Sequence, residues 1–239
     1  KMRLKIMTYN VCSGRNFNNN KIINIRDAGK VIQKYSPDIV GLNEIRGLGD
    51  AEKFFTDQAR TLAEMLGYYY YFAKAIELEA GPYGNALLSR FPILSAETHL
   101  IEDPPVKDED AYYETRCVLK AQLDVNGGLN VYVSHYGLAN SEKVNAVKKT
   151  IELIKDDKKP LIFMGDLNME PSDNKLVPIY EILNDTATVS KDELLTFPSH
   201  APDIKIDYIF VSKNIKILSA NAPAETTSDH RPYIAEIEL

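Results

Sequence analysis

The spacing of hydrophobic residues switches three times between strand-like and helix-like patterns in the first seventy residues. Leu4–Tyr9 alternates in the way of a strand, whereas Arg26–Tyr35 repeats its apolar residues at helical spacing. Asp38–Leu42, introduced by Pro37, is a short apolar run typical of a buried strand, and Ala51–Leu66 returns to helical spacing. The apolar face of that last helix would carry Phe54, Phe55, Leu62, Met65 and Leu66. The chain therefore opens with the order strand, helix, strand, helix.

The remaining two thirds of the chain are richer in strand patterns, with turn signals such as Asn126-Gly127-Gly128 between them. Two further helices are predicted, Ser141–Asp156 with Ser141 as its cap, and Lys175–Leu183. The predicted strands are Tyr68–Ala73, Gly84–Ser89, Ile93–Leu100, Tyr113–Leu123, Leu129–Ser134, Leu161–Gly165, Ile206–Val211, Ile215–Ala220 and Tyr233–Ile237. The early strands of this set read as an antiparallel meander.

Roughly ten strands and four helices in 239 residues fit a single α/β (α+β) domain spanning 1–239. A sheet of that size usually splits into two packed sheets, and helices must cover the outer faces. A layered sandwich is therefore expected. One segment, 101–115, contains six acidic residues, one lysine and two adjacent prolines, and is expected to be a solvent-exposed loop.

The amino-acid composition limits the classes of function that the protein can have. Apolar residues make up 44% and charged residues 26%, and no run is long enough to cross a bilayer. The net charge of -6, without a basic cluster, argues against non-specific nucleic-acid binding, although a bound cation could still bring a polyanion to the protein. Cys12 and Cys117 are too few for a disulfide framework or a zinc site. We expect a cytoplasmic monomer, or a secreted protein if an export signal preceded Lys1.

Polar side chains stand at the ends of eight predicted strands. Each has an ordinary explanation alone, since Asp and Asn favour turns and a terminal His or Arg often bonds a carbonyl. Strand ends meet along common sheet edges, however, so together they indicate one groove. The residues are Tyr9, Asn10, Asn43, Glu44, Asn85, Arg116, His135, Asp166, Asn168, Asp207, Tyr208, Ser228, Asp229 and His230.

The chemistry open to this set is narrow. The chain has no Walker loop, no GxSxG elbow, no HExxH motif and no cysteine beside a histidine partner. Carboxylates and amide oxygens suit Mg²⁺, with Mn²⁺ as the alternative, and Mg²⁺ prefers one or two carboxylates plus water and substrate phosphate. The candidate oxygen donors are Glu44, Asp166, Asp229, Asn10 and Asn168. Phosphoryl transfer to water is the reaction this set indicates.

Six short motifs in the sequence resemble the motifs of a known protein family. They are TYN at 8–10, LNE at 42–44, YGNALLSR at 83–90, GDLN at 165–168, IDYIF at 206–210 and SDHRP at 228–232. Their order and spacing resemble the endonuclease/exonuclease/phosphatase superfamily, which shares its fold with pancreatic-type deoxyribonuclease. The resemblance implies a four-layer sandwich: two mixed, mainly antiparallel sheets packed face to face, with helices outside. It also implies a divalent-metal phosphoesterase site on one rim.

The same resemblance implies roles for individual residues. Metal binding would fall to Asn10, Glu44 and Asp229, and phosphate binding to Asn85, Arg116, Asn168 and His135. The catalytic residues would be His135, Asp166, Asn168, Asp207 and His230. In these roles Asp166 orients or deprotonates the attacking water, His230 faces the phosphate as base or charge stabiliser, and Asp207 fixes the tautomer of His230. Asp166 and Asn168 lie two apart, so strand alternation would turn both toward one phosphate.

Two positions depart from the family pattern. Asn43 replaces the glutamine usual in the LQE motif, and the shorter amide could leave a contact unmade. Cys12 stands where some members carry an extra metal-binding aspartate, which favours one metal over two.

The motifs are common to all branches of the superfamily, so the substrate must be inferred from peripheral features. His135 in SHYGL resembles the deoxyribonuclease-like, sphingomyelinase-like and inositol-phosphatase-like branch, and no basic insertion is visible. We expect a metal-dependent phosphoesterase acting on a phosphate ester, in the first place a phosphodiester of a small molecule or lipid headgroup. The alternatives are a nuclease acting on DNA or RNA and, less favoured, an inactive binding protein on the same fold.

Overall fold

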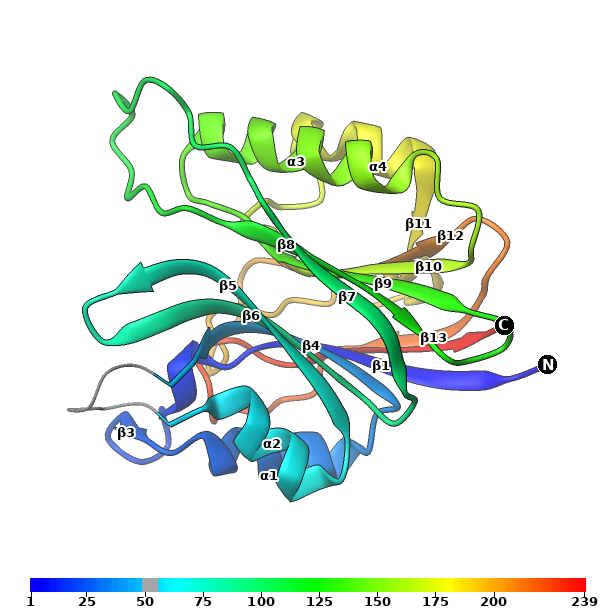
Figure 1. The fold of residues 1–239 in the computed structure, drawn as a ribbon, viewed down its shortest axis with the longest axis horizontal. Helices are drawn as coiled ribbons and strands as arrows, with labels where there is room; N and C mark the ends of the chain where they lie inside the picture. Colours follow the sequence, from blue (N-terminus) through cyan, green and yellow to red (C-terminus); the bar gives the residue numbers. More distant parts are fainter. Residues whose placement is uncertain (49–55) are drawn as a thin grey trace.

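The computed structural model describes residues 1–48 and 56–239 and has four layers (Figure 1). Two six-stranded sheets face each other, and helices cover their outer faces, as the sequence predicts. The first sheet has the order β13 (Lys216–Asn221), β14 (Tyr233–Glu238), β1 (Arg3–Asn10), β4 (Ile39–Arg46), β6 (Gly81–Ser89), β5 (Tyr69–Leu78). The second has the order β11 (Leu183–Asp185), β12 (Asp207–Ser212), β10 (Leu161–Asp166), β9 (Leu129–His135), β8 (Cys117–Leu123), β7 (Ile93–Leu100).

Each sheet contains one parallel pair among antiparallel neighbours. In the first sheet β1 runs parallel to β4, which places Asn10 opposite Asn43. In the second, β9 runs parallel to β10, which places His135 opposite Asp166. Parallel neighbours end at the same edge of a sheet, so each pair brings polar residues to one edge. Hydrogen bonds from Asn10 to Asp166 and from Asp166 N to Asn43 join the two edges into one rim of the sandwich.

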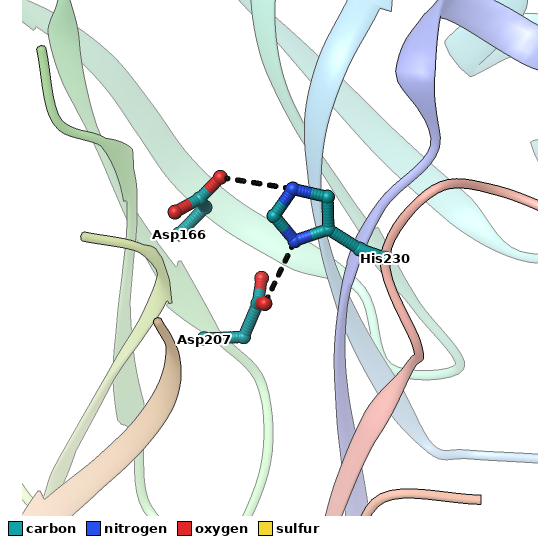
Figure 2. Close-up of side chains that lie close together, drawn as sticks. All are labelled: Asp166, Asp207 and His230. Carbon is teal, nitrogen blue, oxygen red and sulfur yellow. Dashed lines mark hydrogen bonds and ion pairs between the residues drawn. The ribbon is translucent and has the colours of Figure 1, made fainter. Parts of the chain in front are cut away.

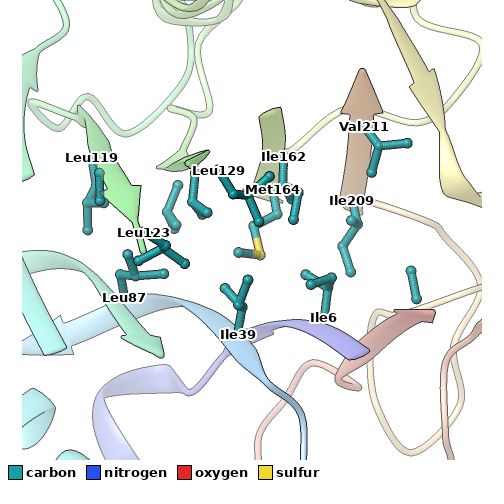
Figure 3. Close-up of a cluster of buried hydrophobic side chains, with 14 of the residues drawn as sticks. Ile6, Ile39, Leu87, Leu119, Leu123, Leu129, Ile162, Met164, Ile209 and Val211 are labelled. Atoms are coloured by element: carbon teal, nitrogen blue, oxygen red, sulfur yellow. The ribbon is translucent and has the colours of Figure 1, made fainter. Parts of the chain in front are cut away.

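Among the described residues, three hydrophobic clusters hold the layers together. The largest lies between the sheets and includes Ile6, Ile39, Leu87, Met164 and Ile209, all without solvent exposure (Figure 3). The sheets come close enough at Gly41 that a Cβ there would lie 2.8 Å from Met164 Sδ, so a side chain at this position would require Met164 to move. The other two clusters lie between each sheet and its own helices.

The helices cover the sheets in pairs (Figure 1). α1 (Ile25–Tyr35) and α2 (Gln58–Leu66) pack on the first sheet, and α3 (Asn140–Ile154) and α4 (Val177–Ile182) on the second. The described residues also contain the 3-10 turns η1 (Cys12–Gly14), η2 (Asn174–Leu176) and η3 (Thr186–Val189) and the two-stranded pair β2 (Arg15–Asn16) and β3 (Ile22–Ile23). No helix in this part of the chain is long and apolar enough to span a membrane.

Several predicted boundaries were wrong. The strand expected from Tyr113 begins at Cys117, because the backbone N–H of Glu114 donates to the Glu142 side chain of α3 instead of to a neighbouring strand. The helix expected over Lys175–Leu183 divides into η2 and α4, with Pro178 in the first turn of α4, where its missing N–H costs no hydrogen bond. The helix expected from Ala51 begins at Gln58 within the described residues, and Phe54 and Phe55 lie outside them.

The cap of α3 also differs from the prediction. Ser141 is not the cap, since the helix already begins at Asn140. The carboxylate of Glu109 accepts hydrogen bonds from the backbone N–H groups of Asn140 and Ser141, at 2.6 and 2.9 Å. A negative charge at a helix N-terminus is favourable, so the acidic segment 101–115 is attached to α3 rather than merely solvated.

Candidate active site

Asp166 lies at the centre of the polar rim. It closes β10, with His135 of β9 opposite on one side and Asp207 of β12 opposite on the other. All three side chains are buried, and Asp166 is 1% exposed. One strand register therefore brings together three residues that lie 31 and 41 positions apart in the sequence.

Asn10 joins the two sheets at this point. Its Nδ2 lies 3.1 Å from Glu44 Oε1, 3.1 Å from Asp166 Oδ2 and 3.5 Å from His230 Nε2. Its Oδ1 accepts the backbone N–H of Cys12 at 3.1 Å, which fixes the orientation of the amide. Residues from β1, β4, β10 and the segment before β14 thus meet around a single side chain.

Glu44 reaches this polar cluster, made of Asn10, Glu44, Asp166 and His230, through an irregularity in β4. The pairing of β4 with β6 shifts register between Leu42 and Ile45, and Glu44 has a φ of 57°. Such bulges redirect a side chain and recur beside functional sites. Burial raises the pKa of Glu44; the hydrogen bond from Asn10 lowers it, and the charge of Asp229 raises it again.

Asp207, His230 and Asp166 form a chain of contacts (Figure 2). His230 Nδ1 lies 2.8 Å from Asp207 Oδ2, and His230 Nε2 lies 3.5 Å from Asp166 Oδ2. Burial alone would lower the pKa of His230, but the charges of Asp207 and Asp166 raise it above its ordinary value. Burial raises the pKa of Asp166, against the charge of His230, which lowers it. The predicted contact between Asp207 and the far nitrogen of His230 is present.

His135 faces Asp166 from the other side. Its Nε2 lies 3.4 Å from Asp166 Oδ2, and its Nδ1 lies 2.8 Å from Arg116 Nη1. Burial, then the charges of Arg116 and His230, lower the pKa of His135 well below its ordinary range, so its ring is neutral. Because a guanidinium has no acceptor, Nδ1 carries the lone pair and Nε2 carries the proton.

Asn43 and Asn85 lie behind the cluster. Asn43 donates to Asn85 Oδ1 at 2.9 Å and to the Ser134 carbonyl at 3.0 Å, and its Oδ1 accepts the N–H of Asp166 at 2.9 Å. The shorter amide at this position therefore leaves neither its donors nor its oxygen without a partner. Asn85 donates to the Cys117 carbonyl at 3.2 Å, so the structure directs this amide into the protein, and its contact with phosphate stays a prediction.

Replacing Asn43 with alanine is expected to lower the free energy of unfolding by about 3 kcal/mol, because three buried polar groups lose their partner. Urea denaturation at neutral pH measures the change. Asn221→Ala, at the exposed end of β13, is the matched control and is expected to change stability little. A loss below about 1 kcal/mol for Asn43→Ala would show that these groups find other partners.

Asn168 is placed differently from the prediction. β10 ends at Asp166, and Asn168 has a φ of 50°, so strand alternation does not orient it. Its backbone N–H donates to Asp166 Oδ1 at 3.0 Å, and its Nδ2 donates to the Tyr136 carbonyl at 2.8 Å. Leu167, between Asp166 and Asn168, is fully buried among apolar residues. Asn168 therefore supports the Asp166 carboxylate directly, and its contact with phosphate stays a prediction.

The donor set beside Glu44 fits a hard divalent cation. Burial, then the charges of Asp229 and Glu44, raise the pKa of Cys12 to about 12. Cys12 is therefore a neutral thiol, which leaves hard carboxylate and amide donors beside a surplus of negative charge. Asn10 turns its Nδ2, not its oxygen, toward Glu44, so its part in metal binding stays a prediction.

A second group of ligand-type atoms is the trio Asp166, Asp207 and His230, whose atoms lie within 4.8 Å of one another. Two of these residues already satisfy each other, since Asp207 Oδ2 and His230 Nδ1 share a 2.8 Å hydrogen bond. A cation between those two atoms would break that bond, so the geometry favours a hydrogen-bonded relay in the trio and a cation nearer Glu44.

Two buried residues beside the cluster were not singled out in the sequence. Lys205 donates to the Asp207 carbonyl at 3.1 Å and lies 3.3 Å from the centre of the Tyr208 ring. Burial lowers the pKa of Lys205 to about 8, against the charges of Asp185 and Asp207. Glu114 lies 3.1 Å from Arg116 Nη1. The only signal for Lys205 was a lysine within the apolar run IKIDYIF, and Glu114 was hidden among the acidic residues of its loop.

Two facing mixed sheets with buried carboxylates, amides and imidazoles at one rim define a class of sandwich proteins that includes phosphoester hydrolases. The chain belongs to the Endonuclease/Exonuclease/phosphatase family, whose model matches residues 7–230. Members of this family hydrolyse phosphoesters, generally with a divalent metal, and include both phosphatases and nucleases.

Individual relatives cover much of the chain. The Escherichia coli K12 protein YbhP is 25% identical over 254 residues, covering 98% of this chain and 96% of YbhP. Exodeoxyribonuclease III of Haemophilus influenzae is 29% identical over 156 residues, covering 60% of this chain and 52% of that protein. The solved mannosyl-6-phosphatase of Bacteroides thetaiotaomicron has a TM-score of 0.78 at 18% identity, covering 99% of this chain and 100% of that one, and shows the shared fold.

Proposed function

We propose that the protein is a divalent-metal-dependent hydrolase of a phosphodiester carried by a small molecule or a lipid headgroup, with water as the attacking group. The observation that supports this most is the meeting of Glu44, Asp166 and His230 around Asn10 Nδ2, at 3.1, 3.1 and 3.5 Å. A metal-binding carboxylate, a water-activating carboxylate and an imidazole are the groups that such a reaction requires in one place.

Each residue has a part that its contacts allow. Asp166 orients the attacking water and accepts its proton, since its Oδ2 faces the cluster while its Oδ1 is held by Asn168. His230, held by Asp207, presents its Nε2 to charge that develops on the phosphate. His135 presents its Nε2–H as a fixed donor to a phosphate or leaving-group oxygen. When bound near Glu44 and Asp229, Mg²⁺ or Mn²⁺ would polarise a phosphoryl oxygen.

The acidic segment 101–115 supports a compact substrate over a polynucleotide. Its last acid, Glu114, contacts Arg116, which contacts His135, so the segment ends beside the cluster. Asp103, Asp108 and Asp110 are exposed within it. Fixed negative charge on a segment that ends beside the site repels a long phosphate backbone more than a single ester, and the protein's net charge of -6 adds to this.

A substrate panel tests the proposal. It compares bis(p-nitrophenyl) phosphate, p-nitrophenyl phosphate, glycerophosphodiesters and supercoiled plasmid, each with Mg²⁺ and with Mn²⁺. Faster hydrolysis of small diesters than of plasmid is expected. Faster nicking of plasmid would favour the nuclease alternative, and no turnover of any substrate, together with no metal binding, would favour an inactive binding protein.

Replacing Glu44 with glutamine is expected to weaken Mn²⁺ binding by at least about 100-fold, because the site loses a carboxylate ligand and its charge. Isothermal titration calorimetry measures the affinity without any substrate. Glu181→Gln, an exposed position on α4, is the control and should bind Mn²⁺ as the wild type does. Unchanged affinity in Glu44→Gln would place the metal elsewhere.

A further inference from the structure

Glu114 is a buried acid at the end of an otherwise exposed acidic segment. It is 8% exposed, and its backbone N–H donates to the side chain of Glu142 on α3 at 2.9 Å. The segment is also held by Glu109, which caps α3. The backbone of Glu114 is therefore held against α3, and its carboxylate faces inward to Arg116.

Arg116 connects this carboxylate to the candidate active site. Its Nη1 hydrogen-bonds His135 Nδ1 at 2.8 Å and lies 3.1 Å from Glu114 Oε1, an ion-pair contact in which Glu114 Oε1 accepts no hydrogen bond. Arg116 is itself 8% exposed. A buried guanidinium needs an opposite charge, and Glu114 is the carboxylate within ion-pair distance of it in the part of the chain that the structure describes.

The position of Arg116 determines the state of the His135 ring. A guanidinium only donates, so Nδ1 must accept and the proton resides on Nε2. That Nε2 lies 3.4 Å from Asp166 Oδ2, on the side where substrate would bind. Without Glu114, the guanidinium would be drawn toward the negative groups of the cluster, and Nδ1 would lose the donor that selects its tautomer.

We propose that Glu114 is a positioning residue: through Arg116 it holds His135 in the tautomer whose Nε2–H points at the substrate. The inference rests on the proposed function for its catalytic consequence, but the tautomer itself does not depend on it. The acidic segment thereby has two separate parts, exposed acids that affect which substrates approach and one buried acid that orients a catalytic histidine.

The test uses the full chain labelled with ¹⁵N-histidine, without metal. The protein has four histidines, so ring spectra that correlate carbon-bound protons with both nitrogens resolve each tautomer. In wild type, His135 should be the single Nε2–H form. Glu114→Gln should convert it to a mixture or an exchanging ring and leave His230 unchanged, whereas Asp110→Asn, exposed in the same segment, should change neither. Glu114→Asp, which retains the charge, should restore part of the wild-type signal.

Kinetics with a small phosphodiester give the second readout. Glu114→Gln is expected to lower kcat by about 10- to 100-fold with a smaller change in KM, because the variant misplaces the His135 donor and leaves Glu44, Asp166 and His230 in place. An unchanged His135 spectrum in Glu114→Gln overturns the proposal, with or without a fall in kcat. A changed spectrum in a protein that hydrolyses nothing supports the positioning role while refuting the proposed function. Thermal denaturation of each variant verifies that it is folded.

Discussion

Asp166→Asn is expected to lower kcat by between about 10²- and 10⁴-fold, the range in which a positioned proton acceptor contributes. The carboxylate is 1% exposed and has Asn10 Nδ2 at 3.1 Å and the two imidazole Nε2 atoms at 3.4 and 3.5 Å. An amide would turn an N–H either toward these donors or toward the backbone N–H of Asn168, and its oxygen is not basic, so no group of comparable basicity remains to take the proton of the attacking water.

The measurement is kcat for a small phosphodiester at saturating Mn²⁺, with calorimetric titration of Mn²⁺ alongside it. Because Asp166 is assigned to the water rather than to the metal, the affinity for Mn²⁺ should change much less than kcat. Asp156→Asn, at an exposed position after α3, is the matched control. If kcat of Asp166→Asn stays within about threefold of wild type, Asp166 is not the proton acceptor.

The residues of this site were predictable because strand ends are local features and parallel neighbours end together. Asn10, Glu44, His135, Asp166 and Asp207 were each found from a polar residue closing or opening an apolar run. Their convergence followed from the two-sheet arrangement, which the structure has. The motif order added the pairing of Asp207 with His230, which spacing alone does not reveal.

What could not be predicted depends on contacts between distant segments or on backbone that leaves the regular strand. Asn168 turns out of β10 at a φ of 50°, so the two-residue period no longer applies to it. Glu44 lies in a bulge for the same reason. The cap of α3 comes from Glu109, 31 residues before Asn140, and no pattern within the helix could identify it. Periodicity describes neighbours along the chain, whereas these features are set by neighbours in space.

Asn43 shows the difference between what the sequence suggests and what contacts in space determine. As a shorter amide in the place of a glutamine, it suggested a missing contact. In the structure the β4 strand brings it between the sheets, where it bonds Asn85, Ser134 and Asp166. The residue thus ties the backbone of Asp166 to the opposite sheet, and stability and site geometry depend on the same amide.

Asp207→Asn is expected to lower kcat by about 10³- to 10⁴-fold, the cost known for removing the carboxylate that orients a catalytic imidazole. Asp207 is fully buried, and its Oδ2 lies 2.8 Å from His230 Nδ1. The charges of Asp207 and Asp166 raise the pKa of His230, so the variant loses both an acceptor and a charge that favours the imidazolium. An asparagine can also donate to Nδ1, which would remove the proton from that nitrogen and leave the ring neutral.

The same ¹⁵N ring spectra distinguish this effect from general damage. Asp207→Asn should change the His230 ring and leave the His135 ring in its Nε2–H form, because Arg116 and Glu114 hold His135 independently. Asp203→Asn, exposed on the segment before β12, should leave both rings and kcat as in wild type. Were kcat to fall while the His230 spectrum stayed unchanged, Asp207 would act by some route other than its imidazole. Both histidines approach Asp166 Oδ2, but different residues hold them, so each ring can be disturbed alone. The falls in kcat caused by Glu114→Gln and Asp207→Asn should multiply in the double variant only if the two rings act independently of each other.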